Sequence, residues 1–148
     1  MKKLDSAVKV TLFANRLVAL VLLALVFTLP WLLDWYCKFR ALTALERTAL
    51  TAAFYVCSVV VALALWNMDR LLLALGRAEV FTTDNVRRIR TIGGCCLATC
   101  LICVPAAFCY YPLVFMVVIM AFLCLAVSVV ASVMDAAVTI REENDLTV

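Results

Sequence analysis

The sequence contains no histidine and few charged residues, and these two shortages argue against several classes of function. Histidine is the commonest metal ligand and the usual general base near neutral pH, and none of the 148 residues is one. Charged residues make up 16% of the chain, against about 25% in soluble proteins. None lies in the interior of the long apolar runs, where ion-coupled transporters and pumps carry such groups. The sequence therefore predicts no catalytic site, no metal site and no cofactor.

Apolar residues are abundant and are arranged in four long runs. They make up 68% of the chain, and the mean hydropathy is +1.12. A helix needs about 18 apolar residues to cross the hydrocarbon core of a bilayer. Runs of about that length or more cover approximately residues 10–33, 48–68, 91–109 and 113–134. The sequence therefore predicts an all-α integral membrane protein, a single domain over residues 1–148 with four transmembrane helices and short loops.

The first run also has one property of a secretory signal peptide, because Lys2, Lys3 and Lys9 precede it. Its apolar stretch from Leu17 to Leu33 is longer than a typical signal core, however. No small-x-small cleavage pattern follows it either. We therefore expect the first run to be an uncleaved helix.

Lysine and arginine are distributed unequally between the two ends of the predicted helices. One side carries Lys2, Lys3, Lys9, Arg16, Arg70, Arg77, Arg87, Arg88, Arg90 and Arg141, and the other carries Lys38, Arg40 and Arg47. Positive residues stay on the cytoplasmic side of a membrane, so both termini are predicted to be cytoplasmic. Arginines beside apolar helices are topology signals, and no direct binding of nucleic acid is predicted.

Residues 69–90, between the second and third runs, are predicted to form an amphipathic cytoplasmic elbow. The second helix continues into this segment, and Gly76 favours a stop because glycine tolerates the left-handed conformation at a helix end. Thr83 and Asp84 then resemble the cap and acidic first turn of a new helix. Three arginines follow at the mouth of the third helix: Arg87, Arg88 and Arg90.

Residues 141–148 form a compact and mostly acidic tail, predicted to leave the fourth helix on the cytoplasmic side. One interpretation is a solvated segment that ends the helix. Another is that its carboxylates pair with the arginines of the elbow. Exposed pairs of this kind contribute about 0–1 kcal/mol each, so they would orient the tail more than hold the fold.

Eight cysteines are present, and two of them form a C-x-x-C pair, Cys100 and Cys103, in the third run. A membrane helix bundle with such a pair is similar to the vitamin K epoxide reductase and disulfide-bond-forming families, which pass electrons to quinone. Those families also use a second cysteine pair in an external loop, for which only Cys37 and Cys109 are candidates here. Cysteine also packs as a small apolar residue. A membrane thiol oxidoreductase therefore remains an alternative.

The fourth run carries small residues at intervals of four, Cys124, Ser128 and Ser132, so they share one helix face. Small residues let helices approach closely in lipid. We interpret this stripe as a packing seam, either within one chain or between copies in a homo-oligomer. An oligomeric channel for small solutes is a second alternative.

The elbow and the tail together resemble a known family. Two segments are similar to bacterial membrane proteins of the domain of unknown function 2975 family. One is the elbow pattern with Gly76, Glu79, Val80, Phe81, Asn85, Val86 and Gly93, and the other is the tail Arg-Glu-Glu-Asn-Asp-Leu-Thr-Val. The resemblance covers essentially the whole chain. It implies a multi-pass protein of the bacterial inner membrane, in a family often encoded beside a small helix-turn-helix regulator of the Cro/C1 type.

This resemblance implies a regulatory or sensing function without catalysis, in which the cytoplasmic surface holds the regulator away from DNA. A lipophilic ligand or membrane stress would alter that surface by favouring one state of the bundle. The residues predicted to bind the partner are Arg87, Arg88, Arg90, Glu142, Glu143, Asn144 and Asp145. The alternative for the arginines is topology and headgroup anchoring, and for the acids an intramolecular clasp.

Overall fold

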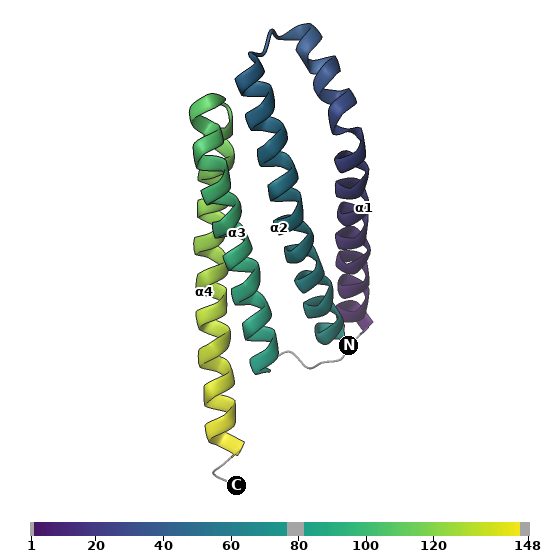
Figure 1. Ribbon diagram of the computed structural model, residues 1–148. Coiled ribbons are helices and arrows are strands. Elements are labelled where there is room, and N and C mark those ends of the chain that lie inside the picture. Colours follow the sequence, from purple (N-terminus) through teal and green to yellow (C-terminus); the bar gives the residue numbers. More distant parts are fainter. Residues whose placement is uncertain (1, 77–81, 146–148) are drawn as a thin grey trace.

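A computed structural model describes the backbone of residues 2–76 and 82–145 and the side chains of residues 8–76, 82–141 and 143. Within these ranges the chain forms four helices and no strand (Figure 1). They are α1 (Lys2–Phe39), α2 (Ala44–Gly76), α3 (Thr83–Cys109) and α4 (Leu113–Asp145). Each is long and apolar enough to cross a membrane. The predicted all-α fold with four transmembrane helices is confirmed.

The helices run alternately up and down, so the bundle has two distinct ends (Figure 1). One end, which we call the terminal end, carries the start of α1, the end of α2, the start of α3 and the end of α4. The opposite end, the turn end, carries the short α1–α2 and α3–α4 connections. The arginines predicted to bind a partner lie on the first two turns of α3, and therefore at the terminal end.

The helices extend beyond the apolar runs that predicted them. α2 continues through residues 69–76, and α3 already includes residues 83–90, so most of the predicted elbow belongs to the ends of two long helices. Residues 77–81 lie outside the described part of the chain. α4 likewise runs on to Asp145, through most of the predicted tail. Continuing a helix keeps its backbone hydrogen bonds internal, which lipid and its headgroup layer both favour.

Local sequence determines where two of the helices begin. Thr43 and Glu46 form a reciprocal cap at α2, in which the Thr43 backbone N–H donates to Glu46 Oε2 at 2.7 Å and the Glu46 N–H donates to Thr43 Oγ1 at 3.3 Å. α3 begins after Thr82, whose carbonyl accepts from the backbone N–H of Asn85 at 3.0 Å. The predicted threonine-led start of α3 is therefore observed, although no side-chain cap bond accompanies it.

Within the described residues, each helix packs against its neighbours in sequence, and α1 and α4 make no close backbone contact. α3 and α4 approach each other closely at Gly93. A Cβ atom on Gly93 would lie 3.3 Å from Val127 Cγ1. Cys124, Ser128 and Ser132 border a shallow hollow with Gly93, but both serines are exposed, so the stripe lies at the edge of this contact and its role as a packing seam stays a prediction. Gly93 itself is the small residue that lets the two backbones approach.

The buried side chains are concentrated on α3, which packs between α2 and α4. They include Val86, Ile89, Cys95, Cys103 and Ala106. Large apolar side chains on the other helices are mostly exposed, among them Phe27, Trp66 and Phe122. A soluble protein rarely exposes a continuous apolar surface of this kind, whereas lipid tails cover one without cost. The exposed surface therefore fits contact with a lipid bilayer.

Candidate functional site

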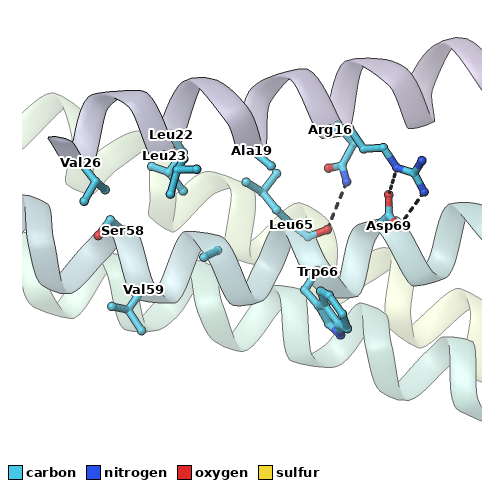
Figure 2. A pocket seen from close by; sticks show the side chains of 12 residues that line it. Arg16, Ala19, Leu22, Leu23, Val26, Ser58, Val59, Leu65, Trp66 and Asp69 are labelled. Carbon is cyan, nitrogen blue, oxygen red and sulfur yellow. Dashed lines mark hydrogen bonds and ion pairs between the residues drawn. The ribbon is translucent and has the colours of Figure 1, made fainter. Parts of the chain in front are cut away.

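A groove of about 430 Å³ lies between α1 and α2 and carries its charged groups at one end (Figure 2). At that end Arg16 Nε lies 3.1 Å from Asp69 Oδ1. The side-chain amide of Asn15 donates to the carbonyl of Leu65 at 3.2 Å. Apolar side chains from both helices, with Ser58 among them, line the rest of the groove toward Val26. Its shape suits an amphipathic molecule, with a polar group near the ion pair and an apolar chain along the helices.

The ion pair explains how Arg16 is accommodated within an apolar helix. We expected its guanidinium to extend toward the headgroups, and its side chain is 61% exposed. The structure adds a partner, because Asp69 near the end of α2 lies beside it. Sequence reasoning noted both residues near the inner ends of their helices and did not pair them. The pair neutralises both charges and joins α1 to α2 at the terminal end.

A second ion pair joins α3 to α4 at the same end. Arg90 Nη2 lies 2.7 Å from Asp135 Oδ2, and both side chains are partly exposed. Of the three arginines predicted to bind a partner, Arg90 therefore already has a carboxylate neighbour. Asp135 could have been suggested from the sequence as a partner of Arg90, since it directly follows the fourth apolar run.

The other two arginines border a polar recess of about 250 Å³. Arg87 is exposed and Arg88 is half-buried. Asp84 and Thr91, one turn away on α3, and Asn67 on α2 complete the recess. It thus presents cationic, anionic and neutral polar groups within a small area.

The acidic residues predicted to bind the same partner lie at the end of α4. Glu143 is exposed. The side chains of Glu142, Asn144 and Asp145 lie outside the described part of the chain, although their backbone continues the helix. The predicted grouping of these acids with the arginines of α3 therefore stays a prediction.

The cysteine neighbours differ from the sequence-based hypothesis, which paired Cys100 with Cys103. Cys103 Sγ lies 3.9 Å from Sγ of Cys57 on α2, and Cys100 Sγ points to the carbonyl of Val117 on α4 at 3.6 Å. All eight cysteines are free thiols, including Cys37 and Cys109. Cys57 was not singled out by sequence reasoning, because an isolated cysteine among apolar residues gives no signal of its neighbour on another helix. Among the described residues, no three histidine, cysteine or acidic side chains gather as they would for a metal ion.

The Cys57–Cys103 pair lies on the wall of a central cavity of about 280 Å³. Side chains from all four helices line it, and they include Leu29 of α1, Phe54 of α2, Thr99 of α3 and Met120 of α4. Its surface is almost wholly apolar. This cavity is therefore suited to an uncharged, largely apolar group.

The turn end is held by aromatic and polar contacts. The hydroxyl groups of Tyr36 and Tyr110 are hydrogen-bonded at 2.8 Å, and the Arg40 guanidinium lies 5.6 Å from the centre of the Tyr110 ring. The hydrogen bond with Tyr36 raises the pKa of the Tyr110 hydroxyl above its usual value. Arg47 of α2 pairs with Asp34 of α1. Tyrosine and arginine in this arrangement are typical of a membrane–water interface.

Comparison with known proteins agrees with the resemblance seen in the sequence. The family model described as "Protein of unknown function (DUF2975)" matches residues 4–148. No curated protein and no solved structure matches the chain. The match covers all four helices, the recess on α3 and the C-terminal segment. The chain therefore belongs to the DUF2975 family.

Proposed function

We propose that this protein is a regulatory or sensing membrane protein without catalytic activity, which controls a small helix-turn-helix regulator of the Cro/C1 type through its terminal end. The family resemblance supplies the kind of partner. The excess of lysine and arginine at the terminal end supports a cytoplasmic orientation of that end in a bacterial cell, where a transcription regulator would meet it.

The observation that carries this proposal is the polar recess beside Arg87 and Arg88. Arginines that serve only as headgroup anchors need no acidic or amide neighbours. Here Asp84 and Asn67 border the same recess, and Arg90 is neutralised by Asp135. A surface with both signs of charge and neutral donors is typical of the polar rim of a protein interface. This mixed surface fits a folded protein partner better than it fits a partner that carries only negative charge.

The bundle offers a route by which a signal would reach this recess. The recess lies on the first turns of α3, and the same helix carries Cys103 at the central cavity. α3 packs closely on α4 at Gly93, between these two points. A lipophilic ligand that binds one packing of the helices better than another would therefore shift the position of the recess.

Affinity capture of the detergent-solubilised protein from its native host, read by mass spectrometry, tests the proposal. We expect the full-length chain to retain a small DNA-binding protein and the chain lacking residues 141–148 to lose it. The double variant Arg87→Ala, Arg88→Ala should lose it as well. Lys38→Ala, which removes an exposed charge at the turn end, is the matched control and should retain it. Absence of a DNA-binding protein from the wild-type capture would overturn the proposal.

A further inference from the structure

Two thiols from different helices meet inside the bundle. Cys57 lies on α2 and Cys103 on α3, with their sulfur atoms 3.9 Å apart. Cys103 is 5% exposed. It lies six residues before the end of α3, or about 9 Å along the helix axis. Cys57 lies 13 residues after the start of α2, so the pair is within the apolar part of the structure, in the half nearer the turn end.

The separation of the two sulfurs is compatible with a covalent bond between them. A disulfide has a length of about 2.05 Å, so the sulfurs would need to approach by about 2 Å. Rotation of the two thiol groups can supply much of this, and α2 and α3 already pack against each other. Cys100 is directed elsewhere, to the Val117 carbonyl. The favoured pairing therefore links two helices rather than two positions of the C-x-x-C sequence.

We propose that Cys57 and Cys103 form a redox-active dithiol that is oxidised by a lipid-soluble quinone bound in the central cavity. Two S–H bonds break and one S–S bond forms between α2 and α3. The two electrons and two protons reduce the quinone carbonyls to the hydroxyls of a quinol. Atoms and charge balance, and reactants and products are all uncharged.

The surroundings of the pair favour a quinone over a water-soluble oxidant. Unpaired charge is costly in an apolar cavity, and a net transfer of two hydrogens leaves none there. The cavity of about 280 Å³ is at the lower limit of small-molecule sites, which suits a quinone ring with its chain outside in the lipid. Met116 and Met120 line it, and methionine is a flexible, polarizable apolar residue that adapts to the shape of a bound group.

The location also protects the oxidised form. Glutathione and thioredoxin keep cytosolic thiols reduced, but both are water-soluble and, in the predicted orientation, act on the far side of the bundle from this pair. A disulfide at this depth would instead follow the redox state of the quinone in the membrane. Closing it would join α2 to α3, the helices that flank the polar recess at their other ends. The inference concerns the thiols alone and stands whether or not a regulator binds the recess.

The test uses the full-length chain in lipid nanodiscs, reduced and then exposed to a short-chain ubiquinone analogue. Quinol formation is followed by absorbance, and the cysteine pairing is read by mass spectrometry of non-reduced peptides. We expect a peptide linked through Cys57 and Cys103, with one quinol formed for each linkage. Cys57→Ala and Cys103→Ala should each lose both signals. Cys100→Ala is the matched control and should keep them, because its thiol is directed to the Val117 carbonyl on α4 and not to Cys57.

Two results would overturn the proposal. One is a wild-type protein that forms no Cys57–Cys103 linkage with the quinone, even if the general thiol oxidant diamide produces it. The other is a linkage through Cys100 and Cys103, with Cys57→Ala as active as wild type. A chain without any cysteine except Cys57 and Cys103 gives a second measurement, since it should still reduce the quinone with the same stoichiometry.

Discussion

The guanidinium of Arg90 lies 2.7 Å from the carboxylate of Asp135 and joins the first turns of α3 to the last turns of α4. The side chains are 63% and 47% exposed, so water and salt screen the pair. Its position therefore matters more for orienting the terminal end than for holding the bundle together. The same reasoning applies to Arg16 and Asp69, which join α1 to α2 at that end.

A double-mutant cycle on Arg90→Ala and Asp135→Ala should show weak coupling. We expect an interaction free energy of about 0–1 kcal/mol, falling as salt is raised, because both groups are solvent-exposed. Thermal unfolding in detergent at two salt concentrations measures it. A coupling that is large and independent of salt would mean that the pair is shielded from water in the membrane.

Gly93→Leu should destabilise the protein by about 1–3 kcal/mol, because the new side chain must displace Val127 at the α3–α4 contact. Gly94→Leu is the matched control, since a Cβ atom there meets nothing within 4 Å. Denaturant unfolding monitored by tryptophan fluorescence compares the two. Equal losses at both positions would show that α3 and α4 do not meet through Gly93.

Asn15→Ala should destabilise the α1–α2 pair by about 0.5–1.5 kcal/mol, because it removes the hydrogen bond to the Leu65 carbonyl. Thr28→Ala is the control on the same helix, since the Thr28 hydroxyl bonds to the carbonyl of Ala24 within α1. Both changes are compared by thermal unfolding in the same detergent. A loss for Thr28→Ala as large as that for Asn15→Ala would argue against the interhelical bond.

The orientation in the membrane can be tested with reporter fusions. We expect green fluorescent protein at the C-terminus to fluoresce, and alkaline phosphatase inserted between Arg40 and Thr43 to be active. The reason is the excess of positive residues at the terminal end. The reverse pattern would place the recess of Arg87 and Arg88 outside the cytoplasm and remove the basis of the proposed regulatory role.

The helices could be predicted because each follows from a property of a continuous stretch of chain. An apolar run of sufficient length must be helical in lipid, since no water is present to satisfy its backbone. Their ends were less predictable from hydropathy, since residues 69–76 and 83–90 lie outside the apolar runs yet belong to α2 and α3. The glycine stop at Gly76 and the threonine and acidic start signal near Thr83 did indicate these ends. A polar helix end remains helical in the headgroup layer, and hydropathy alone does not reveal this.

Whether the candidate sites could be predicted depended on knowing which residues of different helices face one another. The stripe of Cys124, Ser128 and Ser132 was predicted as a seam because its members share a helix face, and it borders a hollow with Gly93 of α3. Because Ser128 and Ser132 are exposed, its packing role stays a prediction. The partner of Cys103 could not be predicted. Nearly the whole surface of α2 is apolar, so nothing in its sequence marks the side that carries Cys57 as the one facing α3.

The amino-acid sequence by itself determined that this chain has four membrane-spanning helices, because length and hydrophobicity act on each segment independently. It also predicted the orientation, which depends on a simple imbalance of positive charge. Only the tertiary structure decided that Cys57 meets Cys103 and that Arg90 meets Asp135. Those contacts depend on the rotation and vertical offset of each helix against its neighbour. In lipid these are set by the close fit of small side chains, and no single segment encodes that fit.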